Sequence, residues 1–552
     1  IVGNVLFGSG NDLLELADGG LSGDVSFGAG NDTLSLGGDA VHAGNVSFGT
    51  GTSAMSLLGS SAFGGTADFG GGSGTLSLSG TSIFLGGIAN GGNVAVTVAG
   101  GTLDLSKPTS IASLSVGATG MLVATLDKAA GSGTAIDVAG NASFAEGAKL
   151  ALRLADVSTA EGSYDVLTAG SITGLDKLDT VETLIPYMFK AEISEDAPGN
   201  VLTVDVARRS VTELGLNRSG AAAYSAVFAA LGEDEEIENS FLAITNGDAF
   251  RQTLATMLPD HAGGVFEGIG QGERTLIRQM QDPVSPIIDE GAFTVTLNLA
   301  LWNSDKGLGD SGAYDLQGHG FSLTGEYDIG FGHVGATLAS LWNQHTNGAA
   351  SDVKNSSFEA AAHWRGNWGP VGGFVRGALG RSDIKSQRVF NGTSDGESVK
   401  RTIKGKWDGD FVSLAAGASA EGGWRYIFFR PQVMVDYVKL DEDGYSETGG
   451  DEALDLTVDA RSSDELGLSA GMVLGADIMG RGSRDSNWLR IETEGGWREV
   501  LDGELGETTA RFAGGDDFTL QGETSTSGWY GRLRAVGGPG GVIMMGELSA
   551  EE

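Results

Sequence analysis

The sequence predicts an all-β chain in which a right-handed parallel β-helix is followed by a short α-helical linker and a transmembrane antiparallel β-barrel. Three observations indicate this fold class. A unit of about 20 residues repeats near the N-terminus, helical periodicity is confined to a middle segment, and apolar and polar residues alternate through the last half. We expect the β-helix over residues 1–207, the linker over 208–288 and the barrel over 289–552.

Composition narrows the classes of function. The 552 residues include 34 Lys and Arg against 72 Asp and Glu, and a net charge of −38 argues against binding to nucleic acid phosphates. The 92 glycines and 9 prolines favour turn-rich β structure. The absence of cysteine excludes disulfides, thiolate catalysis and Cys-ligated metal sites. No apolar run is long enough for a spanning α-helix, so any membrane crossing would use strands.

The repeat near the N-terminus is clearest in its phenylalanines. Four of them are 20, 21 and 21 residues apart: Phe7, Phe27, Phe48 and Phe69. This spacing is typical of one solenoid coil. Short alternating runs at 34–36 and 75–78 direct apolar side chains to one face, while Gly and Asn suit the left-handed corners. We predict stacked coils of a parallel β-helix, with residues 110–206 as the closing coils and cap.

Two aspartates raise the question of calcium. Asp12 and Asp32 end segments 8–12 and 28–32, which resemble the calcium-binding nonapeptide of RTX proteins. However, Phe7 and Phe27 replace the first glycine of that pattern, and the aspartates recur only once per coil before they vanish. We therefore favour Asn-Asp corners of the solenoid. We assign no catalytic, cofactor-binding or metal-binding residue, and calcium at Asp12 and Asp32 stays an alternative.

The β-helical region carries few residues that can catalyse a reaction. No Lys or Arg precedes Lys107, and the only histidine before His261 is His42. Pectin-lyase-like chemistry needs basic residues for a carboxylated sugar, and a Ser-His-Asp triad needs a base. We predict that this region is not an enzyme.

Helical stretches are predicted in the middle segment. Residues 221–231 are rich in alanine, and residues 248–258 place Phe250 and Leu254 on one face before Pro259. A third stretch covers 265–280. It mixes the charged residues Glu273, Arg274 and Arg278 with small residues, which suits either a solvated face or the lining of a wet channel.

The last half of the sequence alternates between apolar and polar residues. Over 293–302 the odd positions are apolar and most even positions are polar, as a strand between lipid and water requires. The alternation recurs, with charge of both signs at many polar positions, in segments 321–329, 427–437, 466–474 and 489–498. A soluble antiparallel sandwich also alternates. We favour the membrane barrel because the runs are many and long and the inner face is charged.

Tryptophan and proline add two expectations for the barrel. All nine tryptophans lie between Trp302 and Trp529, several at the ends of alternating segments, where aromatic girdles meet lipid headgroups. Pro431 lies inside an alternating run and suggests a bulge or a strand end.

The order of the parts resembles the classical (type Va) autotransporter family of Gram-negative outer membranes. The likeness is carried by the glycine-rich β-helix, by linker segments 258–260 and 263–267, and by Glu-Gly-Gly-Trp-Arg at 494–498. The resemblance implies an outer-membrane protein that translocates and displays its own β-helical passenger at the cell surface by type V secretion. The implied partners are outer-membrane lipid, the barrel assembly machinery and periplasmic chaperones, and the passenger is expected to be structural or adhesive.

The resemblance also places one helix in the pore. Residues 264–280 match the pore-threading helix, so Glu273, Arg274 and Arg278 would meet lumen residues such as Arg490 or Glu492. Family barrels have twelve strands and end in an aromatic residue, whereas about eleven strands are counted here, the last over 542–548. We therefore expect the sequence to be incomplete at both ends. The alternatives are a calcium-binding RTX-like surface adhesin, a porin-like channel with an appended β-helix and, last, a surface hydrolase.

Overall fold

The computed structural model describes residues 1–127, 136–181, 184–194, 199–281, 293–347, 350–479, 487–523, 527–538 and 544–551. The chain forms two compact units. The first contains Ile1–Gly215, Glu235–Arg251 and Gly392–Val399, and the second contains Leu216–Asp234, Gln252–Asn391 and Lys400–Glu552. The expected boundary between 288 and 289 lies outside the described residues. Within the described ranges, no helix is both long and apolar enough to cross a membrane.

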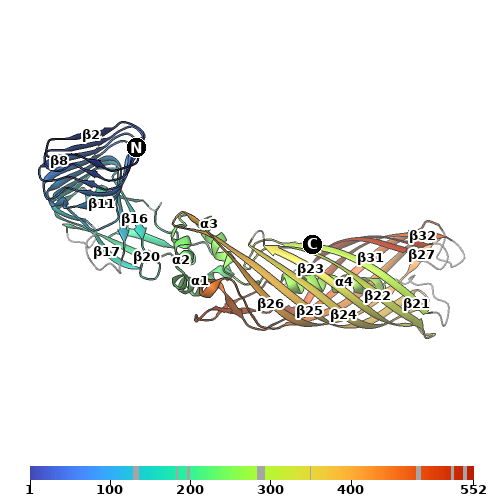
Figure 1. The fold of residues 1–552 in the computed structure, drawn as a ribbon. Coiled ribbons are helices and arrows are strands. Elements are labelled where there is room, and N and C mark those ends of the chain that lie inside the picture. The colour runs from blue at the N-terminus through green and yellow to red at the C-terminus, as the bar shows by residue number, and fades with distance from the viewer. Residues whose placement is uncertain are drawn as a thin grey trace. The chain divides into compact units, whose positions relative to one another are not determined.

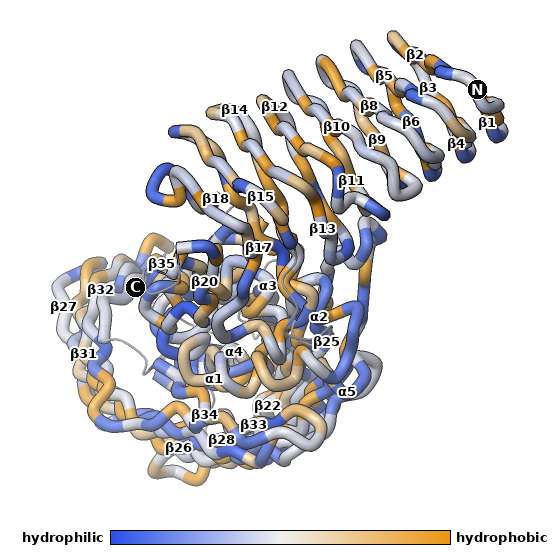
Figure 2. The backbone as a smooth tube through the Cα atoms, turned by 90° about the vertical axis from the view of Figure 1, so that its left-hand side faces the viewer, coloured by the Kyte–Doolittle hydropathy of each residue, from blue (hydrophilic) through white to orange (hydrophobic). Residues whose placement is uncertain are grey.

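The first unit is built around a parallel β-helix, as predicted. Each coil contributes short strands that pair in parallel with the neighbouring coils, and Figure 2 shows the coils stacked in sequence order. One face is the ladder β2-β5-β8-β10-β12-β14-β16-β18. The strands are β1 (Val5–Leu6), β2 (Leu13–Leu16), β3 (Gly20–Ser22), β4 (Val25–Ser26), β5 (Thr33–Leu36), β6 (Val41–Ala43), β7 (Val46–Ser47), β8 (Thr52–Leu57), β9 (Ala62–Asp68), β10 (Ser73–Leu78), β11 (Ile83–Ala89), β12 (Val94–Leu105), β13 (Thr109–Ile111), β14 (Ser113–Leu126), β15 (Ile136–Phe144), β16 (Lys149–Leu154), β17 (Gly162–Thr173) and β18 (Asp179–Val181).

Aromatic columns fill the core of the β-helix. The rings of Phe7, Phe27, Phe48 and Phe69 stack at centroid distances of 5.0, 5.0 and 5.1 Å. A second column contains His42, Phe63 and Phe84, at 5.4 and 4.9 Å. Because each ring repeats once per coil, the spacing seen in the sequence becomes vertical stacking, which confirms the coil prediction.

The β-helix ends in an antiparallel cap, as expected. Strand β20 (Val201–Arg208) pairs antiparallel with β17 and with β19 (Phe189–Ile193), so it covers an edge that would otherwise expose backbone groups. The same unit contains α2 (Glu235–Leu242) and the start of α3 (Gly247–Thr256). The carboxylate of Glu238 accepts the Val157 N–H at 2.7 Å, which fixes α2 to the cap side of the unit.

The second unit contains one large antiparallel sheet, hereafter the barrel sheet (Figure 1). Among the described residues, eleven strands follow one another on its hydrogen-bonded path, which agrees with the count from the sequence, and β27 (Gly422–Trp424) pairs beside β28. Position 542 of the expected last strand lies outside the described residues. The path strands are β21 (Phe293–Lys306), β22 (Tyr314–Asp328), β23 (His333–Asn347), β24 (Ser351–Trp368), β25 (Val371–Ser394), β26 (Glu397–Ala420), β28 (Ile427–Glu442), β31 (Arg461–Asp477), β32 (Trp488–Glu504), β35 (Gly528–Gly538) and β36 (Met544–Glu551).

The two faces of the barrel sheet differ in polarity. On β21 the apolar side chains at odd positions point outward, and Leu297 and Leu299 are 73% and 78% exposed. On β22 the intervening Ser322, Thr324 and Glu326 are buried on the inner side. The outward residues are therefore not packed between two sheets, which excludes the soluble sandwich and confirms the alternation as that of a barrel wall.

The girdle expectation, which was made for several of the nine tryptophans, fits four of them. Trp407 and Trp488 are buried, and Trp302 packs against lumen residues, because these positions fall on the inner side of the two-residue alternation. The outward tryptophans that fit a girdle are Trp368, Trp424, Trp497 and Trp529.

Pro431 interrupts a ladder without a bulge, so the bulge reading is wrong. The β26 ladder reaches Ser419 opposite Gln432, and β27 resumes with Gly422 opposite Phe429, in the same register. The missing N–H of Pro431 explains the interruption between them. On its other side Pro431 pairs in register with Met472.

The two ends of the barrel sheet carry connections of different length. The long-loop end has the connections 443–460 and 505–527, and the short-turn end has 329–332 and 369–370. The long loops form a small sheet, the loop sheet, of β29 (Tyr445–Ser446), β30 (Leu456–Val458), β33 (Thr508–Phe512) and β34 (Phe518–Leu520), beside α5 (Asp451–Leu454). Helix α1 (Arg218–Ala230) packs on β33, β34 and α5.

Candidate functional site

Helix α4 (Gly264–Arg278) lies in the lumen of the barrel sheet and continues as a single 3-10 turn, Gln279–Gln281 (Figure 1). Gly264 lies against His345, near the long-loop end of β23. Met280 packs with Phe374, near the short-turn end of β25. The helix therefore runs lengthwise through the lumen, which confirms the expectation for residues 264–280.

One face of α4 consists of glycine at every fourth position: Gly264, Gly268 and Gly272. These glycines lie against three inward side chains of β23, which are His345, Asn343 and Leu341. A Cβ at the three positions would lie only 2.6, 2.6 and 3.0 Å from those side chains. Four helical residues rise about 6 Å and two strand residues about 6.7 Å, so the two rows stay in step. The sequence shows this G-x-x-x-G-x-x-x-G pattern, but the sequence analysis did not single it out.

Apolar residues of α4 fasten the helix to the opposite wall. Val265, Phe266 and Ile269 are buried in one cluster with strand residues Val353, Ile384, Trp407, Phe411, Val438 and Leu440. Ile277 joins Met280, Phe374, Ala415 and Met434 in a second cluster. On the side of strands β24 to β28, the helix is thus held by close packing in addition to the polar contacts.

A buried ion triplet joins α4 to two strands. Arg376 donates to the Glu273 carboxylate on α4 at 2.8 Å and to the Glu359 carboxylate on β24. All three side chains are at most 1% exposed. Removing one partner of such a buried group leaves an uncompensated charge, at a cost of about 3–5 kcal/mol. The triplet therefore fixes both the depth and the rotation of α4.

A second charged group surrounds Arg274, the helix residue next to Glu273. Arg274 donates to Glu267 at 3.0 Å and lies 3.7 Å from Glu465. Glu465 also accepts from Arg498 at 2.8 Å, and Arg498 reaches Asp436 at 2.7 Å. The inner wall of the barrel sheet thus carries charge of both signs, as predicted.

The expected partners of the helix charges were wrong in identity. Arg490 contacts Asp477 at 2.9 Å and Glu421 at 3.1 Å, and Glu492 accepts from Arg430 and Arg534. These pairs lie within the barrel wall near the short-turn end. Arg490–Asp477 joins neighbouring strands, and Arg430–Glu492 reaches across β31. Arg278 instead donates to the Ser549 hydroxyl on β36 at 3.0 Å. Partner identity depends on strand register, which alternation alone does not give.

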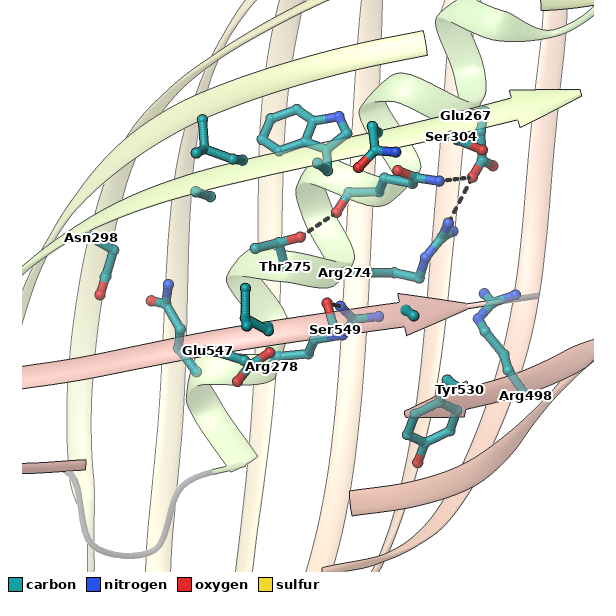
Figure 3. Close-up of a pocket in the computed structure, with 18 of the residues that line it drawn as sticks. Glu267, Arg274, Thr275, Arg278, Asn298, Ser304, Arg498, Tyr530, Glu547 and Ser549 are labelled. Atoms are coloured by element: carbon teal, nitrogen blue, oxygen red, sulfur yellow. Dashed lines mark hydrogen bonds and ion pairs between the residues drawn. The ribbon is translucent and has the colours of Figure 1, made fainter. Parts of the chain in front are cut away.

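A cavity of about 1860 Å³ lies between α4 and strands β21 and β36 (Figure 3). Its lining includes Glu267, Arg274 and Arg278 of the helix, and Figure 3 shows these side chains turned toward the strands. Asn298 and Glu547 line it from the two strands. The polar lining makes this part of the lumen suitable for water.

The linker enters the lumen through a buried, charged contact. Asp260 lies 2.9 Å from His345 Nε2 and 3.4 Å from Arg461. Burial alone would raise the pKa of Asp260, but His345 and Arg461 outweigh it and hold the pKa below its usual value. The segment just before α4 is therefore held by a carboxylate that stays ionised.

The corner residues of the β-helix act as backbone caps. Side chains of Asn and Asp accept N–H groups of adjacent coils in the pairs Asn4–Asp24, Asn11–Asn31, Asp24–Asn45, Asn31–Thr52 and Asn45–Thr66. Asp32 likewise accepts the Asp12 N–H at 3.0 Å. Within the described residues, no cluster of three or more His, Asp or Glu side chains has metal-binding geometry. The geometry of Asp12 and Asp32 suits the corner role.

His42 is a core residue of the β-helix. It is fully buried, and its Nε2 lies 3.0 Å from the Gly23 carbonyl oxygen. Burial lowers the pKa of His42 below 6.5, although the Gly23 carbonyl and Asp24 oppose the shift. The imidazole is thus neutral and enclosed, away from any external substrate.

Comparisons with known proteins bear on the barrel sheet. The autotransporter β-domain family matches residues 299–535. The esterase EstA of Pseudomonas aeruginosa is 29% identical over 177 residues, which cover 30% of this chain and 26% of the relative, and EstA of Pseudomonas putida gives the same figures. The chain thus spans about a quarter of the length of the curated relatives it matches.

Solved structures of translocator domains match this chain at lower sequence identity. The translocator domain of NalP from Neisseria meningitidis superposes with a TM-score of 0.37 and 14% identity, covering 53% of this chain and 96% of that one. The transport unit of AIDA-I from Escherichia coli gives 0.27 and 11%, covering 52% and 92%. The assignment rests on the sequence match over 299–535. Residues 299–535 are therefore an autotransporter β-domain, and a β-helix and a helical segment precede it in the chain.

Proposed function

We propose that the barrel sheet exports residues 1–207 as a passenger and displays them on the cell surface, with 208–288 as the linker and 289–552 as the translocator domain. The carrying observation is the position of α4. This helix lies in the lumen directly before the first barrel strand, so the chain that precedes it leaves through the long-loop end. Longer loops are extracellular in barrels of this kind, which gives the passenger an outward direction.

The stacking of coils outside the cell can make export directional without nucleotide hydrolysis. Each coil pairs only with its neighbours, so every coil that folds outside opposes backward sliding. The sequence has no cysteine, so no disulfide-locked loop has to pass the lumen. We propose outer-membrane lipid, the barrel assembly machinery and periplasmic chaperones as partners, on the basis of the family.

We propose a structural or adhesive passenger without enzymatic activity. The one histidine of residues 1–207 is the buried His42, and its ring is part of an aromatic column. The esterase activity named for the relatives belongs to those proteins. Hydrolysis of a short-chain nitrophenyl ester by the full-length chain, above the rate in buffer, would contradict this part of the proposal.

Surface display is tested with single cysteines, because the chain has none of its own. Leu85 is 48% exposed on the β-helix, and Tyr426 is 64% exposed at the short-turn end. We expect Leu85→Cys to react with a membrane-impermeant maleimide on intact cells. Tyr426→Cys is the matched control and should react only after the outer membrane is opened.

External protease provides the second readout. It should remove the β-helix from intact cells and leave the barrel sheet protected. A fully protected Leu85→Cys variant, in cells with a verified intact outer membrane, would refute display.

A further inference from the structure

Two buried arginines hold the chain where it meets the lumen. We define the exit segment as residues 256–260, which precede α4. Arg388 on β25 donates to the Thr256 carbonyl oxygen, and Arg461 on β31 donates to the Asp260 carbonyl oxygen at 2.8 Å. Arg388 is 2% exposed and the Arg461 side chain 9% exposed. Both ends of the exit segment are thus bound through main-chain atoms.

Each arginine that contacts the exit segment is also held in place by a carboxylate of the barrel sheet or its loops. Arg388 binds both carboxylate oxygens of Glu447 and also donates to the Leu454 carbonyl oxygen at 2.8 Å. Arg461 binds both carboxylate oxygens of Glu442, at 2.7 and 2.9 Å. Such forked pairs orient a guanidinium rigidly, so its remaining N–H groups point in a set direction.

Aromatic packing supports this arrangement from the lumen side. Trp407 donates through its indole N–H to Glu442 at 2.9 Å, and its ring stacks on Tyr445 at 4.1 Å. Trp407 also belongs to the apolar cluster that seats α4. The groups that hold the arginines are therefore part of the same packed layer as the helix.

The two arginines bind the exit segment through contacts that any residue could make and through one contact that only Asp260 can make. Main-chain carbonyl oxygens are offered by every residue that passes, whereas the Asp260 carboxylate meets His345 and Arg461 only when this residue arrives. Met257 and Leu258 inside the exit segment are buried, as is Ala262 just after it, so the held segment runs on into buried chain.

We infer that Arg388 and Arg461 form an exit clamp that arrests the exit segment at the end of translocation, keeps the passenger outside and closes the long-loop end of the lumen. This inference rests on the proposed function. The clamp acts as a positioning device, since neither arginine takes part in a reaction.

The test uses the full-length chain carrying Ala262→Cys as a reporter. Ala262 is 8% exposed and packs with Tyr314 and Leu316 behind the clamp. In detergent micelles, with folding verified by heat modifiability, we expect Arg388→Gln and Arg461→Gln each to raise the maleimide labelling rate at least tenfold. Arg461→Lys retains one charged donor and should raise it less than threefold.

Arg381→Gln is the matched control, because this arginine lies on the same strand as Arg388 but is 66% exposed and pairs with Asp408 outside the lumen. Its labelling rate should stay at the parent value. If an arginine variant does not fold, the labelling rate of the Asp260→Asn variant tests the clamp instead, since this substitution alters the exit segment and leaves every strand intact. Folded Arg388→Gln and Arg461→Gln variants that label within twofold of the parent would overturn the clamp.

Intact cells separate the clamp from the proposed function. On cells, clamp variants should lose protease-accessible passenger over time while the parent retains it. If the parent itself shows no accessible passenger, the proposed function fails, and the labelling rates in micelles still decide the clamp.

Discussion

His42 is the residue whose chemistry depends most directly on burial in the β-helix. It occupies an aromatic column in which the next coils place Phe63 and Phe84. Burial holds its pKa below 6.5, so the folded state resists a proton that the unfolded chain accepts. Stability contributed by the neutral ring is therefore full above about pH 6.5 and is lost as the pH falls below that value.

The corresponding prediction concerns acid stability. The urea midpoint of the β-helix, followed by far-UV circular dichroism, should fall between pH 7.5 and pH 5. His42→Phe should reduce this pH dependence, because it continues the aromatic column with a group that does not titrate. A pH dependence of equal size in His42→Phe would assign the effect to other groups.

At the level of single residues, the sequence predicted the role of a side chain better than the identity of its contact partners. The corner role of Asp12 and Asp32 follows from composition, because Asn and Asp readily bond to nearby backbone groups. The partners Arg376 and Glu359 of Glu273 could not be named, because they lie 103 and 86 residues away and are brought together by register.

At the scale of elements, α4 depends on its glycine face. Gly268 lies against Asn343 on β23, and an added Cβ would lie 2.6 Å from that side chain. At Gly270 an added Cβ would meet only the flexible end of Arg274, at 3.2 Å. The two positions lie on the same helix but differ in the space beside them.

Alanine at the two glycines should therefore act in opposite directions. Gly268→Ala should destabilise the second unit by about 1–3 kcal/mol through overpacking. Gly270→Ala should be neutral or stabilising by up to about 1 kcal/mol, since alanine is the better helix former. Urea unfolding in micelles, followed by tryptophan fluorescence, measures both. Equal effects at the two positions would contradict the role of the glycine face.

Elements with strong periodicity were predictable, and those set by loops were not. Residues 265–280 and 293–302 have clear helical and alternating patterns, and the structure has α4 and β21 there. The loop sheet was missed because its strands, such as Leu456–Val458 and Phe518–Leu520, are three residues long and show no period. The inward turn of Trp407 was missed because this residue lies outside the alternating segments that the sequence analysis singled out.

At the scale of the whole molecule, the two units have different sources of stability. The β-helix is stabilised by contacts between successive coils, so its stability adds coil by coil. The barrel sheet is stabilised by continuous hydrogen bonding between long strands and by the packed lumen. All nine tryptophans lie in the second unit, so their fluorescence reports on that unit alone.

We therefore expect two separate unfolding transitions in urea, with the β-helix first. Phe48 is 1% exposed between Phe27 and Phe69, and Phe48→Ala should cost the first transition about 3–5 kcal/mol. The tryptophan transition should stay at its parent midpoint. Leu85→Ala, at an exposed position of the same β-helix, is the control and should shift neither transition measurably. A single transition shared by circular dichroism and fluorescence, moved by Phe48→Ala, would show that the units unfold together, because a core defect confined to one unit can lower the midpoint of the other only when their folding is coupled.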